Sequence, residues 1–288
     1  MSENKRKSIL TVGINSIFLF AASILAFSAP AQADLLEKIK ERGEFIVGTE
    51  ARYPPFEFIK DGKIVGYSAD VMVYIMKELP GVKLKRLDLP WQGILPGLAA
   101  KKFDYVITCV SGTKARYKKY ALSLPIGNGT LGLVKRKGDN SINSPADIAG
   151  KVVGTQIGSG PLKGLKVYAE ELAAKGTPVK EIKTYVDFDE AYADLAAGRT
   201  SAVTNSLPNL FELARKRPDV YEVVMPTFGP KKYLSWAGRK DADSESLVRF
   251  MDEQIRKLNK SGVLNELQIK WMGGAVDLPW DKYPVPEH

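Results

Sequence analysis

The chain has 288 residues, 44% of them hydrophobic, and a formal net charge of +9 at pH 7, so it can bury a substantial core in one or two domains. Its basic residues are scattered and do not cluster with aromatic residues, which argues against nucleic-acid binding. Cys109 is the only cysteine and His288 the only histidine, which excludes an intramolecular disulfide, Ser-His-Asp or Cys-His catalysis and the usual histidine-based zinc sites.

Residues 1–33 have the three parts of a secretory signal peptide. A basic start at Lys5-Arg6-Lys7 precedes an apolar run over 17–27, and Ala31-Gln32-Ala33 is a small-residue cleavage site. We expect cleavage before Asp34, without a lipid anchor, because no cysteine stands at the cut. The alternative is an uncleaved membrane anchor, but the apolar run is short for a span.

The first half of the exported chain alternates between helical and strand patterns, which is typical of α/β layers. In order, we expect a helix at 34–42, a strand at 44–48, a proline-containing loop at 49–58, a hairpin turn at 61–62, a helix at 70–79, a strand at 82–89, a helix at 91–101 and a buried strand within 103–110.

The second half continues the alternation. In order, we expect a short helix at 145–149, a strand at 152–155, a helix at 161–175, a strand at 182–186, a helix at 190–197, strands at 200–204 and 220–224 on either side of a helix at 207–216, a strand at 233–237, and helices at 244–260 and 263–271. Asp189 is the expected N-cap of the helix at 190–197, and Asn205 or Ser206 that of the next helix.

The segment 103–116 carries the most specific chemistry. Its strand ends in small residues, and Thr113 can N-cap a short helix that has Arg116 in its first turn. A guanidinium is a planar fork that binds a carboxylate through two hydrogen bonds. The segment therefore indicates either a carboxylate-binding site or a surface arginine paired with a neighbouring acid, and by itself it leaves both open.

Nearly all of the exported chain resembles the periplasmic amino-acid-binding proteins of ABC importers, solute-binding protein family 3. The resemblance rests on several motifs in the family's order, namely the aromatic loop of 48–58, Gly66-Tyr67-Ser68-Ala69-Asp70-Val71, the segment 91–98, the Asp…Thr-x-x-Arg pattern that ends at Arg116, Gly158-Ser159-Gly160, and the closing helix of 262–273.

This resemblance implies the type II periplasmic-binding-protein fold, an α/β fold of two lobes joined by two crossover strands. Lobe 1 would comprise residues 34–127 and 228–288, and lobe 2 would comprise residues 132–227. The hinges would lie near 126–133 and 225–235, where glycines can absorb changes in backbone torsion.

The resemblance also implies a ligand in the cleft between the lobes. Arg116 and the backbone N–H groups at 158–160 would hold its carboxylate, aromatic rings would cover it, and Glu50 would contact its far end. Cys109 would line the cleft without acting as a nucleophile. The residues expected in this site are Glu50, Tyr53, Trp91, Thr108, Cys109, Ser111, Arg116, Gly158, Ser159, Gly160, Asn205 and Ser206.

The sequence departs from the family pattern where the ligand's amine is held. Asn205 and Ser206 stand where the family usually has an aspartate, and Ser68 replaces another common aspartate. Neutral groups hold an ammonium more weakly than a carboxylate does. The departure therefore favours an amino-acid derivative with a secondary amine, such as an opine or a sugar–amino-acid conjugate.

The function implied is capture of a polar amino acid or derivative in the periplasm for import through a permease with its ATPase. We expect a monomer that performs no catalysis and needs no cofactor, metal or nucleic acid. Two alternatives stay open. One is an exported dehydratase-like enzyme on the same fold with Glu50 as proton donor, and the other is a ligand-sensing domain.

Overall fold

The computed structural model describes residues 34–284, which belong to one compact unit. The predicted signal peptide and His288 lie outside these residues. Within 34–284, no helix has both the length and the apolar character needed to cross a bilayer.

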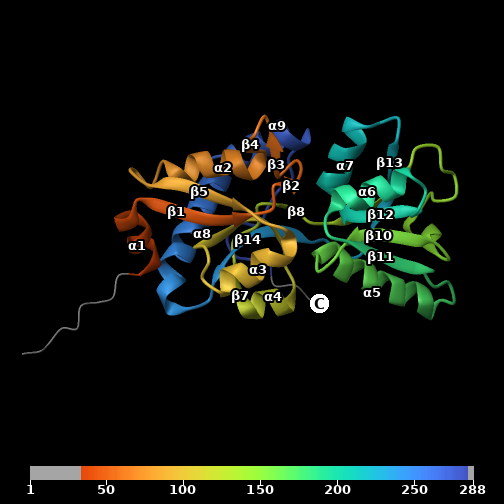
Figure 1. Ribbon diagram of the computed structural model, residues 1–288, viewed down its shortest axis with the longest axis horizontal. Coiled ribbons are helices and arrows are strands. Elements are labelled where there is room, and N and C mark those ends of the chain that lie inside the picture. Colours follow the sequence, from red (N-terminus) through yellow and green to blue (C-terminus); the bar gives the residue numbers. More distant parts are fainter. Residues whose placement is uncertain (1–33, 285–288) are drawn as a thin grey trace, which may run out of the picture. The chain divides into compact units, whose positions relative to one another are not determined.

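Six strands form the first sheet (Figure 1), in which β1, β5 and β6 run parallel and β14 pairs antiparallel with β6, β7 and β8. These strands are β5 Lys83–Asp88, β1 Glu44–Thr49, β6 Tyr105–Ser111, β14 Tyr233–Arg239, β7 Tyr120–Leu122 and β8 Gly127–Asn128. The helices of this part are α1 Leu35–Arg42, α2 Tyr67–Met76, α3 Trp91–Ala99, α4 Lys114–Lys119, α8 Glu245–Lys260 and α9 Val263–Met272.

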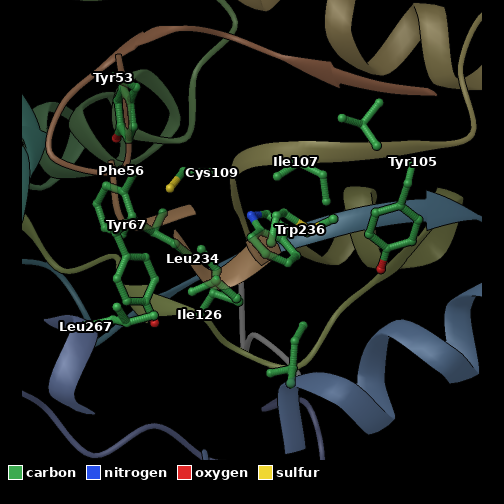
Figure 2. Close-up of a cluster of buried hydrophobic side chains, with 14 of the residues drawn as sticks. Tyr53, Phe56, Tyr67, Tyr105, Ile107, Cys109, Ile126, Leu234, Trp236 and Leu267 are labelled. Carbon is green, nitrogen blue, oxygen red and sulfur yellow. The ribbon is translucent and has the colours of Figure 1, made fainter. Parts of the chain in front are cut away.

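Strand β6 is buried on both faces because helices cover both sides of the sheet. All seven of its residues are buried. Tyr105, Ile107 and Cys109 join the core that α1, α2, α8 and α9 complete, as Figure 2 shows around Trp236. Val106 and Val110 belong instead to the core under α3. This alternation is the period of two expected of a strand, and it determines which side chains at the end of β6 share a face.

Five strands form the second sheet, drawn in green to cyan in Figure 1, in which β9 runs antiparallel to both of its neighbours, β12 and β13. Its strands are β11 Glu181–Tyr185, β10 Val152–Gln156, β12 Ala202–Ser206, β9 Leu131–Arg136 and β13 Tyr221–Phe228, and its helices are α5 Gly160–Ala174, α6 Phe188–Ala196 and α7 Leu207–Lys216. The chain passes from the first sheet to the second between β8 and β9, and it returns between β13 and β14.

A small three-stranded sheet carries the loop that follows β1. It consists of β2 Arg52–Tyr53, β3 Glu57–Lys60 and β4 Lys63–Val65, with the predicted hairpin turn at Asp61-Gly62. The backbone N–H groups of Tyr67 and Ser68 donate to the carbonyls of Pro55 and Phe56 (3.0 and 2.9 Å). Because this loop satisfies the first donors of α2, the helix starts at Tyr67 and not at the predicted residue 70.

Two further predictions about helices are wrong. Asp187, and not Asp189, caps α6, because its carboxylate accepts from the backbone N–H of Glu190 at 3.0 Å. The helix predicted at 145–149 is a 3₁₀ turn, η1 Pro145–Ile148. The earlier start of α6 leaves the Asp189 side chain without a capping role.

Candidate ligand-binding site

Arg116 is positioned by the turn between β6 and α4, as the sequence predicted. The hydroxyl of Thr113 accepts from the backbone N–H of Arg116 at 3.2 Å and so caps the helix. The guanidinium donates through Nη1 to the carbonyl of Ser111 (3.1 Å) and through Nη2 to that of Gly158 (3.0 Å). It also lies over the Trp91 ring, 4.9 Å from its centroid. The cation is therefore held between groups of the first sheet and the loop after β10.

The half-buried Arg116 guanidinium has no carboxylate partner among residues 34–284. Burial lowers its pKa to about 10, so it stays a cation at neutral pH. Two carbonyls give it hydrogen bonds but no counter-charge, and a cation withdrawn from water is strongly stabilised by an anion. The arrangement therefore favours a carboxylate ligand over the alternative of a surface ion pair.

The N-terminus of α5 lies beside Arg116. Ser159 caps this helix by accepting from the backbone N–H of Leu162 at 3.1 Å, and its hydroxyl donates to the carbonyl of Gln156 at 2.7 Å. A Cβ atom on Gly160 would come within 2.1 Å of Ser111 Oγ, so only glycine allows this approach of α5 to β6. A helix N-terminus and a guanidinium together form a site suited to an anion.

These groups enclose a small cavity, which we call the Arg116 cavity. Its volume is about 10 Å³, the space of a single water molecule. Of the predicted site residues, eight line it, namely Glu50, Tyr53, Trp91, Cys109, Ser111, Arg116, Ser159 and Gly160, and they are joined by Gln156, Pro161 and Phe188.

Three of the residues that line the cavity were not predicted from the sequence. Gln156 ends β10, Pro161 lies in the first turn of α5, and Phe188 opens α6 directly after β11. Ligands of open α/β sheets bind beyond the carboxyl ends of the strands. Applied to the ends of β10 and β11, that rule would have predicted Gln156 and Phe188 as site residues.

Thr108 and Gly158 are placed differently from their predicted roles. The Thr108 hydroxyl donates to the carboxyl group of Glu57, and Thr108 does not line the Arg116 cavity, so its expected role as a backbone or hydroxyl donor to the ligand stays a prediction. Gly158 contributes its carbonyl, which accepts from Arg116, where an N–H donor was expected. Because side chains alternate along a strand, Thr108 lies on the opposite face of β6 from Cys109 and Ser111, which line the cavity.

Asn205 and Ser206 are engaged by protein groups. The Tyr53 hydroxyl donates to Asn205 Oδ1 (2.8 Å) and lies 3.2 Å from Ser206 Oγ, while Asn205 Nδ2 donates to the Tyr192 hydroxyl (2.9 Å). The Tyr53 ring also packs against Phe188, with centroids 5.7 Å apart. These contacts join the loop after β1 to the second sheet.

Glu50 is the acid of the Arg116 cavity. Its side chain is buried, and Gln156 Nε2 donates to its Oε1 at 2.6 Å. Burial raises its pKa to about 7, against the opposing effect of the Gln156 hydrogen bond. The carboxyl group is therefore close to half ionised at neutral pH. It can accept a hydrogen bond from an amine, and it can gain or lose a proton.

A second acid, Glu57, lies behind the cavity and was not predicted. It accepts from Thr108 and from the backbone N–H of Cys109 (3.2 Å). Burial raises its pKa to about 8, so it is mainly protonated at neutral pH. Burial also raises the pKa of the Cys109 thiol, which keeps it protonated and fits a packing role.

The comparisons with known proteins identify the class. The model of the bacterial extracellular solute-binding proteins, family 3, matches residues 45–274. The chain belongs to this family, and its fold is the type II periplasmic-binding-protein fold.

Its relatives are named for the binding of amino acids. The chain is 32% identical to the L-cystine-binding protein TcyJ of Escherichia coli, over 92% of this chain and 95% of the relative. It is also similar to the structure of ArgBP from T. maritima, with 30% identity and a TM-score of 0.71, covering 83% of this chain and 99% of that one. A third similar structure is the ancestral amino acid-binding protein AncCDT-1, a precursor of cyclohexadienyl dehydratase, with 29% identity and a TM-score of 0.69, covering 82% of this chain and 99% of that one.

Proposed function

We propose that this chain is the periplasmic binding subunit of an ABC importer, and that it captures an amino acid or amino-acid derivative through its carboxylate. The observation that carries the proposal is the Arg116 guanidinium, which lies at the N-terminus of α5 without an acidic partner among residues 34–284. The bound molecule would replace the two carbonyls as the partner of this cation and so gain a charge-assisted, bidentate pair.

Binding would couple two lobes, residues 34–127 with 228–288 and residues 132–227. Arg116 and Trp91 belong to the first, and Ser159 and Gln156 to the second. A ligand that contacts both groups favours the conformation in which they meet, by its difference in affinity for the two conformations. Hinges near 126–133 and 225–235 would allow that motion, and the permease with its ATPase would receive the loaded monomer.

The acids that can meet the ligand's amine support a class of ligands that includes amino-acid derivatives. Asn205 and Ser206 are neutral, and Tyr53 and Tyr192 already engage Asn205. Glu50 is the carboxyl group that lines the Arg116 cavity. Glu50, with a pKa near 7, can bind a secondary amine as well as a primary one. Opines and sugar–amino-acid conjugates therefore belong in the ligand class with the amino acids.

The test is calorimetric titration of wild type and variants with hits from a thermal-shift screen of amino acids and opines. Arg116→Ala should abolish binding, and Arg116→Lys should weaken it about tenfold or more, because an ammonium cannot pair through two parallel hydrogen bonds. Lys118→Ala is the matched control, since this exposed residue of α4 carries the same charge. A hit should raise the melting temperature of wild type.

Unaltered affinity in Arg116→Ala would refute the carboxylate assignment. Hits confined to simple amino acids would refute the opine preference and leave the importer function standing.

An enzymatic role is the second candidate, because the Glu50 carboxyl group, with a pKa raised to about 7, could act as a general acid. The structural similarity to AncCDT-1, a precursor of cyclohexadienyl dehydratase, also supports this second candidate. Prolonged incubation of a bound hit with the protein decides between the two: recovery of the unchanged molecule supports the binding role, and turnover that Glu50→Gln abolishes supports the enzyme.

A further inference from the structure

A second cavity lies beyond the Tyr53–Phe188 ring pair. Its volume is about 170 Å³, and it is lined by the loop after β1 and by α6 and α7. Tyr53 and Phe188 line both this cavity and the Arg116 cavity, so the ring pair separates the two. We call it the Asp189 cavity. An apolar cavity of 150 Å³ can hold a benzene molecule, so this one has room for the end of an amino-acid side chain.

Three aromatic rings, those of Tyr53, Phe188 and Tyr192, line part of the Asp189 cavity. Phe188 stacks on Tyr192 with centroids 6.0 Å apart, and the Tyr53 ring is tilted against Phe188 with centroids 5.7 Å apart. Aromatic faces attract cations, and guanidinium or ammonium groups on an apolar stem fit between such rings.

Two acceptors in the lining of the Asp189 cavity have no hydrogen-bond or ion-pair partner among residues 34–284. Asn209 is buried, its Nδ2 donates to the Pro54 carbonyl at 2.7 Å, and its Oδ1 has no hydrogen-bond partner among the described residues. Asp189 takes part in no ion pair or hydrogen bond among residues 34–284, because Asp187 caps α6 in its place. A buried acceptor without a donor costs stability that a ligand's N–H group would restore.

The cations in the lining of this cavity are already matched. Arg52 pairs with Asp88 at 3.2 Å, and Lys216 pairs with Glu212 at 3.2 Å. Asp189 is therefore the charged residue of the lining that forms no ion pair among residues 34–284, although it is also attracted to Arg52 and Lys216, and its carboxylate favours a positively charged end of a ligand.

We propose that the Asp189 cavity is the subsite for the far end of the ligand, and that this end carries a cation or a protonated amine. The inference rests on the proposed function, because the same ligand places its carboxylate on Arg116. Such a ligand moves the Tyr53 ring from Phe188 and runs through both cavities. The ligand class is then an elongated amino acid or derivative with a second, cationic end, read by Asp189 and Asn209, while Glu50 lies nearer to the α-amine.

The experiment compares ligands that differ only at the far end. L-arginine is paired with L-citrulline, which replaces the guanidinium by a neutral urea group, and L-cystine is paired with S-methylthio-L-cysteine, which lacks the second amino-acid end. Calorimetric titration of wild type should give a stoichiometry of one and a preference of about tenfold for the member of each pair whose far end carries a guanidinium or ammonium group.

Two variants test the subsite directly. Asp189→Asn should lower that preference to about threefold, because the Asp189 side chain is exposed and its pairing is partly screened. Leu213→Trp, which adds bulk to the cavity lining, should weaken binding of both members about tenfold or more.

Matched controls lie outside the cavity lining. Asp219→Asn removes the same charge from an exposed residue, and Phe211→Trp adds bulk to an exposed position of α7. Neither should change an affinity by more than about twofold.

The possible failures are distinct. Equal losses for both members in Asp189→Asn, no effect of Leu213→Trp, or a stoichiometry of two would overturn the subsite while Arg116→Ala still abolished binding. If Arg116→Ala retained affinity, or if no amino acid or derivative bound, the proposed function itself would fail, and the subsite with it.

Discussion

At the scale of single residues, the site depends on charges withdrawn from water without full compensation. Arg116 lacks an acidic partner among residues 34–284, and Glu50 and Glu57 are buried carboxyl groups with raised pKa values. Burial disfavours the charged form of an acid, so each group favours either a neutral state or a partner of opposite charge. These residues trade stability for binding capacity, which is common at functional sites.

Glu57 gives a prediction about pH. Its pKa is about 8 in the folded chain and about 4.3 in an unfolded one, so its contribution to stability is complete below about pH 4.3 and is lost as the pH rises through about 8. Glu57→Gln cannot ionise, so the variant should match wild type in melting temperature at pH 4 and exceed it at pH 8.5.

Thermal unfolding at the two pH values checks this expectation. The exposed Glu78→Gln should follow wild type at both. A Glu57→Gln curve parallel to wild type across the range would show that the Glu57 carboxyl group is not withdrawn from water.

At the scale of elements, the C-terminal segment packs against the turn that carries Arg116. The Tyr283 ring stacks on Tyr117 of α4, with centroids 5.5 Å apart. A Cβ atom on Gly112 would lie 1.6 Å from the Tyr283 hydroxyl oxygen. The segment after α9 therefore supports the end of β6 and the start of α4, although it follows them by more than a hundred residues in the sequence.

This contact predicts coupling between two substitutions. Gly112→Ala should lower the free energy of unfolding by about 1–2 kcal/mol, because the new methyl group displaces the Tyr283 side chain. Tyr283→Ala removes the obstacle, so the double variant should lose less than the sum of the two single losses. Urea unfolding of the four proteins measures the coupling, and simple additivity would contradict the contact.

At the scale of the whole molecule, the contacts that complete the site are between groups far apart in the sequence. Tyr53 with Asn205, Glu50 with Gln156 and Arg116 with Gly158 all link the first sheet and its loops to the second. The two chain passages between the sheets are short. Side-chain contacts across the cavity therefore hold the first sheet and its loops against the second sheet.

Solution scattering provides the matching prediction. Saturating ligand should lower the radius of gyration of the chain expressed from residue 34, because it favours the conformation in which both proposed lobes touch it. Arg116→Ala, given the same ligand concentration, should show no change. An unchanged radius in wild type at full occupancy would argue against hinge motion.

The sequence alone determined the features that depend on local chemistry. The α/β alternation, the Thr113 cap that positions Arg116 and the family's motifs could be read from residue spacing, because helix caps, strand periods and turns involve neighbours in the chain. Most of the candidate site followed from the same motifs, as the cavity lining of Tyr53, Trp91 and Ser159 shows.

The tertiary structure decided what depends on distant partners. It directed Thr108 to Glu57, engaged Asn205 with Tyr53 and Tyr192, brought Phe188 and Gln156 into the cavity, and left Asp189 and Asn209 Oδ1 without partners among the described residues. Whether a polar side chain is free to contact a ligand depends on its burial and on hydrogen bonds to residues distant in the chain. Neither can be predicted from residue spacing along the sequence.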